Sequence, residues 1–76
     1  MNIQVGQIFI KSYQNENGDT FVSKYVVTDV TAKTVTVLKE GGRDAPMKRR
    51  VDFSKAFGAY CINLESYSQH RAYLQA

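Results

Sequence analysis

The sequence predicts a mostly β protein, folded as a small antiparallel barrel or a strongly bent meander of four to five strands with a C-terminal helix. Three observations carry this prediction. Runs rich in β-branched and aromatic residues, separated by turn residues, fill the first two-thirds of the chain. The apolar period then changes towards that of a helix. With 76 residues the chain is long enough for one domain, 1–76, and a single lean core.

The first three expected strands are joined by short turns. Asn17-Gly18 is the clearest turn signal, because this pair tolerates the positive φ that a hairpin requires. Ala32-Lys33 is a second tight turn, without glycine. The strand after it alternates Thr with Val, which indicates one polar and one apolar face. The three strands are expected at Gln4–Gln14, Thr20–Thr31 and Thr34–Lys39.

A loop and a fourth strand are expected next. Glu40–Pro46 contains two adjacent glycines and a proline, which cannot donate a hydrogen bond to a neighbouring strand. Met47–Phe53 then alternates. One face is expected to carry Met47, Arg49, Val51 and Phe53, and the other Lys48, Arg50 and Asp52.

The segment at 54–63 has two interpretations. Phe53, Phe57, Tyr60 and Leu64 are spaced as on one face of a helix. Ser54 would then be the N-cap, although an interior Gly58 weakens a helix. The alternative is a turn at Ser54–Gly58 followed by a strand at Ala59–Asn63. The last part of the chain, about 64–75, is compatible with a helix, with Tyr67, Arg71 and Leu74 on one side.

The run Val5-Gly6-Gln7-Ile8-Phe9-Ile10 resembles the first strand of KOW and Tudor-type SH3-like domains. Those domains often begin with Val-Gly, an acidic residue and alternating β-formers; Gln7 stands in the acidic position here. The resemblance covers this strand and the general strand order, and it implies an SH3-like barrel. In size and style the chain also resembles small accessory proteins of bacteriophages and mobile elements.

Composition limits the location and the partners. The formal net charge of +3 and the pI of about 9.2 favour acidic partners such as nucleic acid or an acidic protein face. The one cysteine cannot form an intrachain disulfide, which favours a reducing cytoplasm, the host cytoplasm if the protein is phage-encoded. Neither a signal peptide nor a membrane-spanning segment is expected, so no membrane partner is predicted.

The most prominent polar feature is a basic run on the fourth strand. Arginine and lysine side chains neutralise phosphates, each adding to a salt-dependent affinity. Lys48 and Arg50 are expected to point to solvent, and Arg49 inward or to an edge, paired with Asp52 or Glu40. The alternative is a charged edge strand that resists aggregation. The candidate basic contacts are Arg43, Lys48, Arg49 and Arg50.

Aromatic residues near the first turn are the second feature. Exposed rings there would stack on bases or grip a peptide, whereas buried rings would fill the core. Phe21 is expected in the core. For Tyr13 and Tyr25 the core and a half-exposed position, which their hydroxyls suit, are both open, and the two residues are added to the candidate binding residues.

No motif in the sequence amounts to an active site. Cys61 and His70 are the only candidate nucleophile and base, with no evident third residue to orient them. One Cys and one His cannot build a structural zinc site, and the carboxylates lack calcium-loop spacing. The protein is therefore predicted not to be an enzyme, with no cofactor and no metal.

Two functions remain open. The first is a nucleic-acid-binding module that uses the strand and loop at Arg43–Arg50. The second is a phage-type protein-interaction module that binds and inhibits or modulates a host protein with an acidic face. Dimerisation through a strand edge is also open. Anchors for a protein partner would be Tyr13, Tyr25, Arg43, Tyr67 and Tyr73.

Overall fold

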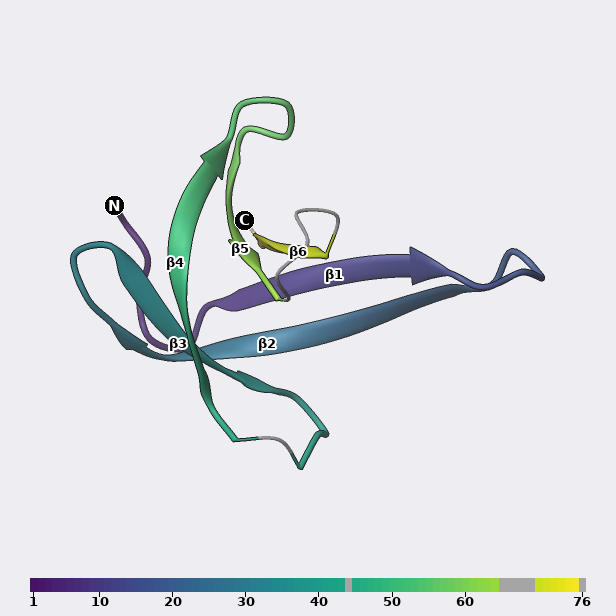
Figure 1. Ribbon diagram of the computed structural model, residues 1–76, viewed down its shortest axis with the longest axis horizontal. Coiled ribbons are helices and arrows are strands. Elements are labelled where there is room, and N and C mark those ends of the chain that lie inside the picture. The colour runs from purple at the N-terminus through teal and green to yellow at the C-terminus, as the bar shows by residue number, and fades with distance from the viewer. Residues whose placement is uncertain (44, 65–69, 76) are drawn as a thin grey trace.

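The computed structural model describes residues 1–43, 45–64 and 70–75. Within them six antiparallel strands form one sheet that closes on itself in chain order, with the last strand paired to the first (Figure 1). The predicted β class is therefore confirmed, with more strands than expected. The strands are β1 (Ile8–Gln14), β2 (Thr20–Val30), β3 (Thr34–Lys39), β4 (Met47–Ser54), β5 (Ala59–Asn63) and β6 (Arg71–Leu74).

The hairpin of β1 and β2 forms where the turn signal predicts it. Gly18 has a φ of +84°, and its N–H donates to the Asn15 carbonyl oxygen at 3.1 Å. The Asn15 side-chain oxygen accepts from the N–H groups of Asn17 and Asp19, both at 3.0 Å. Asparagine side chains stabilise turns in this way, which sets the register of the hairpin.

The first strand begins later than predicted. Gln4–Gln7 form a turn in which the Gln7 N–H donates to the Gln4 carbonyl at 3.2 Å, and Gly6 has a φ of +96°. That backbone conformation is incompatible with an extended strand, so β1 starts at Ile8. Of the run that resembles KOW and Tudor-type domains, only Ile8–Ile10 lies in the strand.

β2 and β3 follow the predicted boundaries closely. The turn between them contains no glycine, and the Thr31 N–H donates to the Thr34 carbonyl at 2.9 Å. The register shifts between Val27 and Asp29, which marks a β-bulge. Bulges increase local twist and bend a strand, so this one helps the sheet to curl.

At 54–63 the turn-and-strand alternative is confirmed and the helix is wrong. Ser54 acts as a cap, because its hydroxyl oxygen accepts the Phe57 N–H at 3.4 Å. However, Gly58 has a φ of +61°, which ends any helical turn. The chain then returns as β5, with Phe53 opposite Tyr60 and Ser54 opposite Ala59.

The predicted C-terminal helix is also wrong where the structure describes the chain. Arg71–Leu74 form β6, which pairs with β5 through Ile62↔Ala72 and with β1 through Phe9↔Leu74. Residues 65–69 and 76 lie outside the described residues. The strand exists because it fills the gap between two others, a non-local cause that sequence periodicity does not reveal.

The core is the inside of the ring, and every strand except β4 supplies a fully buried side chain to it. Phe9 and Ile62 are the largest of these, each with 0% exposure. Apolar burial of this kind is the main stabilising term in folding. The buried cluster consists of Ile3, Phe9, Tyr25, Val27, Val35, Val37, Ile62, Leu64 and Ala72.

The β1–β2 hairpin continues beyond the ring as a two-stranded arm (Figure 1). β1 pairs with β6 only at Phe9 and Ile10, whereas its pairing with β2 runs on to Gln14↔Thr20. The molecule is accordingly elongated, with extents of 40 × 31 × 24 Å. No helix among the described residues is long and apolar enough to cross a membrane.

Candidate nucleic-acid interface

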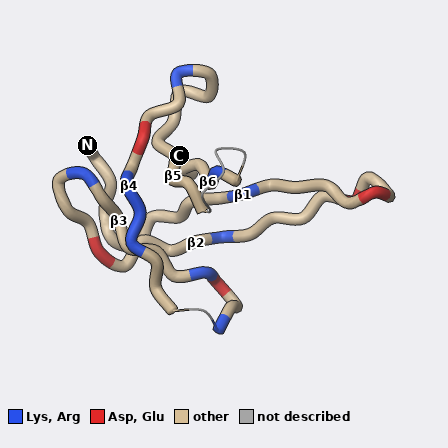
Figure 2. The backbone as a smooth tube through the Cα atoms, in the orientation of Figure 1, with Lys and Arg blue, Asp and Glu red and all other residues tan. Residues whose placement is uncertain are grey.

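The fourth strand presents two cations on its outward face, as predicted. Lys48 lies opposite Thr36 and Arg50 opposite Thr34 on β3. Both basic side chains are exposed, whereas Met47 and Val51 are partly buried against the core. Figure 2 shows the basic residues following one another along β4. Alternation along an antiparallel strand thus produces a surface with two cations beside two threonines.

Arg49 points to the other side of β4 and serves the fold. Its guanidinium donates to the Lys48 carbonyl at 2.9 Å and to the Leu64 carbonyl at 3.5 Å. A further contact reaches the Met47 sulfur at 3.5 Å. The predicted inward position is confirmed, but the bonds go to carbonyl groups and a sulfur and not to Asp52 or Glu40.

Arg43 is exposed in the β3–β4 loop, which extends beyond the end of the sheet (Figure 2). Gly41, with a φ of +74°, turns the chain there, and the Gly42 N–H donates to the Lys39 carbonyl at 3.3 Å. Arg43 is therefore an exposed cation of this loop.

The aromatic candidates lie in two different environments, the core and the exposed arm. Tyr25 is 7% exposed and its ring belongs to the core, so of the two interpretations open for it the core is confirmed. Tyr13 is 47% exposed and lies on the arm. Phe21, predicted in the core, is 43% exposed and stacks on Tyr13. Phe21 lies on the same side of β2 as the buried Tyr25, as the alternation predicts. However, Tyr13 and Phe21 lie on the hairpin past the end of the ring, where there is no core to bury them.

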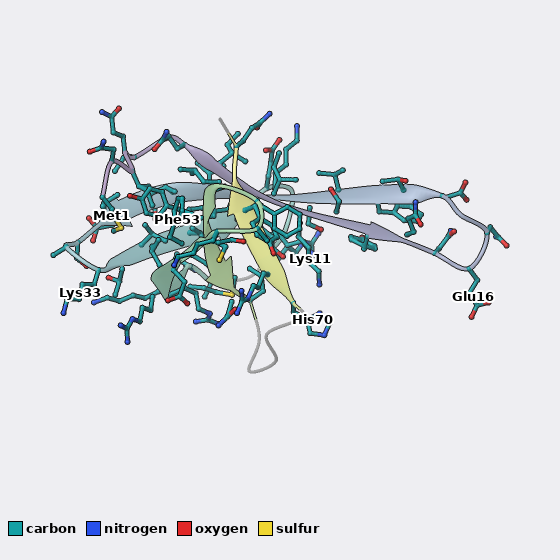
Figure 3. The ribbon with its side chains drawn as sticks, turned by 90° about the horizontal axis from the view of Figure 1, so that it is seen from above. Met1, Lys11, Glu16, Lys33, Phe53 and His70 are labelled. Carbon is teal, nitrogen blue, oxygen red and sulfur yellow. The ribbon has the colours of Figure 1, made fainter. Side chains whose placement is uncertain are left out.

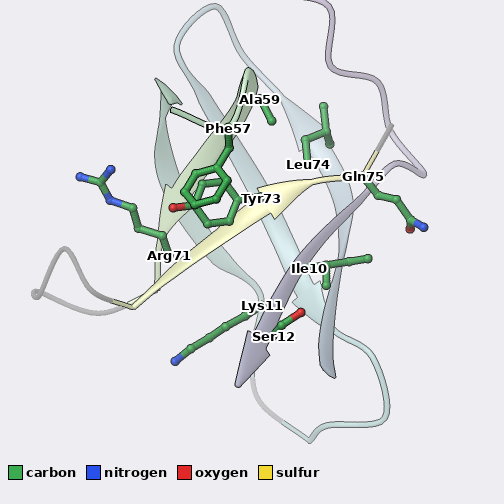
Figure 4. Close-up of a pocket in the computed structure, with 9 residues that line it drawn as sticks. All are labelled: Ile10, Lys11, Ser12, Phe57, Ala59, Arg71, Tyr73, Leu74 and Gln75. Carbon is green, nitrogen blue, oxygen red and sulfur yellow. The ribbon is translucent and has the colours of Figure 1, made fainter. Parts of the chain in front are cut away.

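A second surface feature was missed by sequence reasoning. A groove of about 530 Å³ lies over β1, β6 and the start of β5 (Figure 4). Phe57, from the β4–β5 turn, packs on Tyr73 of β6 with ring centroids 4.8 Å apart and planes at 57°. Phe57 remains 70% exposed. The groove is lined by Ile10, Lys11, Ser12, Phe57, Ala59, Arg71, Tyr73, Leu74 and Gln75.

Two cations lie beside these rings. Figure 4 shows the side chains of Lys11 and Arg71 leaving β1 and β6 in diverging directions, so that their charged ends lie apart. The Lys11 ammonium lies 2.9 Å from Nδ1 of His70, and the two residues are labelled side by side in Figure 3. An ammonium has no acceptor, so Lys11 donates and Nδ1 accepts. Arg71 Nε donates to the Asn63 side-chain oxygen at 3.1 Å, which fixes the guanidinium.

The candidate nucleophile lies in an environment that does not activate it. Cys61 is 1% exposed, and burial raises the pKa of its thiol, an effect that the nearby Arg71 charge partly offsets. A nucleophilic cysteine needs the opposite, a lowered pKa and access to solvent. Among the described residues there is no group of three or more His, Cys, Asp or Glu placed to hold a metal ion.

No protein-family model, no curated protein and no solved structure matches this chain. Tyr67, named above as an anchor, lies outside the described residues.

Proposed function

We propose that this protein is an SH3-like binding module that contacts the phosphates of nucleic acid through the outward face of β4. The observation that carries the proposal is the pair Lys48 and Arg50, both exposed on one face of a strand held in a closed sheet. The small closed sheet of antiparallel strands joined in chain order supports the SH3-like description.

The surroundings of the pair favour an anionic ligand. Across the part of the chain that the structure describes, neither side chain forms a hydrogen bond or an ion pair. Thr36 lies opposite Lys48, and hydroxyl groups are regular partners of phosphate oxygens. The Thr34 hydroxyl, opposite Arg50, is hydrogen-bonded to that of Thr31. The two cations are therefore available for phosphates without first breaking an internal salt bridge.

Acidic residues near Lys48 and Arg50 limit the size of the positively charged surface. Asp29 lies opposite Thr36, in the same cross-strand row as Lys48. Asp52 follows Arg50 by two residues and is exposed on the same face of β4. These charges weaken the positive potential at both ends, so the face suits a few phosphates and a salt-sensitive affinity.

The test is the salt dependence of binding to a fluorescently labelled duplex, measured by anisotropy. In the double variant Lys48→Gln, Arg50→Gln, we expect weaker binding at low salt and a slope of log K against log salt that falls by about 1.8. Lys24→Gln with Lys55→Gln is the matched control, since it removes the same charge from exposed positions on other elements. No binding by the unmodified protein at low salt, or an equal effect of both variants, would refute the proposal.

A second candidate function, protein interaction, is favoured by the arm. Its exposed rings, Tyr13 and Phe21, are stacked and preorganised, and its tip carries Glu16 and Asp19, which repel phosphate. Figure 3 shows Glu16 at the far end of the arm. Beyond Ile10 the described residues give β1 no partner but β2, so an open edge for strand addition, including dimerisation, lies here.

Affinity purification with and without nuclease separates the two functions. A protein partner that is still recovered after nuclease treatment, and is lost in the double variant Tyr13→Ala, Phe21→Ala, supports protein interaction through the arm. Recovery of nucleic acid alone, lost in the double variant Lys48→Gln, Arg50→Gln, supports nucleic-acid binding through β4.

A further inference from the structure

We propose that the groove over β1, β6 and the β4–β5 turn binds one nucleotide of a single-stranded nucleic acid. The base stacks on the exposed ring of Phe57, which packs on Tyr73, and the phosphates on the two sides of this nucleotide contact Lys11 and Arg71. The inference rests on the proposed nucleic-acid function but concerns another site and another state of the ligand. β4 contacts phosphates of any form, whereas this groove requires an unstacked base.

The aromatic pair is built as a platform. Phe57 is 70% exposed, the highest value among the exposed large hydrophobic side chains of the described residues. The Phe57 N–H···Oγ Ser54 hydrogen bond at 3.4 Å fixes the backbone at this residue, and the ring itself is supported by its contact with Tyr73. An immobilised ring that remains open to solvent loses little entropy when a base stacks on it.

The charges of the groove suit an anion. Neither Asp nor Glu occurs among the nine residues that line it, whereas Lys11 and Arg71 both do. Lys11 is held by His70 and Arg71 by Asn63, and neither bond neutralises its cation. Arg71 also uses only Nε in its bond to Asn63, so its terminal nitrogens point outward, as Figure 4 shows. A planar guanidinium of this kind matches two phosphate oxygens.

The remaining lining distinguishes a nucleotide from a simple anion. The apolar floor is formed by Ile10, Ala59 and Leu74, and the volume of about 530 Å³ lies in the range of small-molecule sites. Ser12 and Gln75 add hydrogen-bonding groups at the edges, which is where a base or sugar presents its polar atoms. Bases in a duplex are stacked on each other, so only a single strand offers a free face.

The experiment compares three probes by fluorescence anisotropy: a labelled oligothymidine, an abasic strand of equal length and a duplex. Phe57→Leu keeps the apolar volume and removes the ring. We expect about tenfold weaker binding to the oligothymidine, with no change on the abasic strand or the duplex. Phe53→Leu is the matched control, because Phe53 is also an exposed phenylalanine on this hairpin but does not line the groove. It should leave all three affinities unchanged.

The phosphate contact is tested with Lys11→Gln and Arg71→Gln. Their combination should lower the salt slope on the oligothymidine by about 1.4. Tyr73→Phe keeps the platform and should bind the oligothymidine within twofold of the unmodified protein. Thermal unfolding of each variant checks the fold, and Phe57→Leu is expected to be folded because its ring is exposed.

The outcomes separate this inference from the proposed function. Equal loss of affinity on the oligothymidine and the abasic strand in Phe57→Leu, or no loss on either, would overturn the stacking site while leaving the β4 proposal standing. No binding of any probe at low salt would overturn both. Adenosine monophosphate, added to isotope-labelled protein, distinguishes a free nucleotide from a strand: shifts at Phe57 and Tyr73 without oligothymidine binding would overturn the strand and leave a mononucleotide site.

Discussion

The ring of Tyr13 stacks on that of Phe21, with centroids 5.4 Å apart and planes 22° from parallel, although neither lies in the core. The two residues are directly opposite each other in the β1–β2 register. Cross-strand aromatic pairs are a main stabilising element of two-stranded ribbons. This pair therefore holds the arm together where the ring of strands no longer supports it.

Tyr13→Ala should loosen the arm and leave the ring intact. Removing the pair costs about 0.5–1.5 kcal/mol of local stability. Hydrogen exchange should accelerate at 11–14 and 20–23, with the midpoint of thermal unfolding nearly unchanged. Val22→Ala, at an exposed position outside the pair, is the control. A large drop in the midpoint would show that the arm supports the core.

Phe9→Ala should destabilise the whole protein. Phe9 is 0% exposed and lies opposite both Tyr25 and Leu74, so its truncation leaves a cavity where the first and last strands meet. The expected cost is about 3–5 kcal/mol in urea unfolding. Phe53→Ala, at a position 56% exposed, should cost less than about 1.5 kcal/mol. Similar costs for the two variants would contradict the assignment of the core.

Gly58→Ala should be destabilising for a conformational reason alone. A Cβ at this position meets no atom within 4 Å, but the φ of +61° is unfavourable for an L-residue. We expect a cost of about 1–2 kcal/mol, smaller for Gly58→Asn. Gly42→Ala is the control: its φ lies outside the left-handed region and its nearest neighbour is the Lys39 side chain at 3.4 Å. Denaturant unfolding of the three variants measures these costs. An equal cost for Gly58→Ala and Gly42→Ala would contradict the conformational explanation.

Cys61 should make stability fall at alkaline pH. Burial raises the pKa of its thiol in the folded protein, so the unfolded state releases this proton first. The stabilising contribution is complete below the pKa of an unfolded cysteine, about 8.5, and is lost as pH rises through the folded value. The decline measured by urea unfolding should be shallower in Cys61→Ala. Equal slopes would contradict a buried, neutral thiol, as would rapid reaction of the native protein with a thiol reagent.

Adjacent arginines on β4 should respond differently to the same change. Arg49→Gln removes bonds to the Lys48 and Leu64 carbonyls and should cost about 1 kcal/mol of stability. Arg50→Gln should leave stability unchanged and weaken duplex binding instead. Thermal unfolding and anisotropy measured on both variants check this, and a reversed pattern would contradict the two facings assigned to β4.

Local signals predicted the first four strands because the alternation and turn residues there agree with the final pairing. Thr34–Lys39 was predicted to the residue, and Met47–Ser54 differs by one. The predicted C-terminal helix and the helical interpretation of 54–63 were wrong for a different reason, whereas the alternative strand at Ala59–Asn63 is confirmed. Spacings of three and four at Phe53, Phe57, Tyr60 and Leu64 fit a helix, but pairing with β4 and β6 is more favourable, and Gly58 ends the turn. Pairing between distant strands is invisible to local periodicity.

In the candidate site, too, the features set within one strand could be predicted from the sequence and those that depend on closure of the sheet could not. The outward position of Lys48 and Arg50 follows from alternation within one strand, so the sequence alone predicts it. The burial of Tyr25 was also accessible, since it shares its inward side with Val27. The groove was not accessible. Its rings and cations come from β1, a turn and β6, and only closure of the sheet brings them together.

Closure through β6 also has a consequence for synthesis on the ribosome. The ring depends on Phe9 meeting Leu74, so the nascent chain cannot complete its core until residue 74 has left the exit tunnel. Until then the edges of β1 and β5 are unpaired and the apolar inner face is open, which is the condition in which strands aggregate. The ring therefore folds in a nearly all-or-none event after its last strand has emerged, and until then its apolar inner face is available to chaperones.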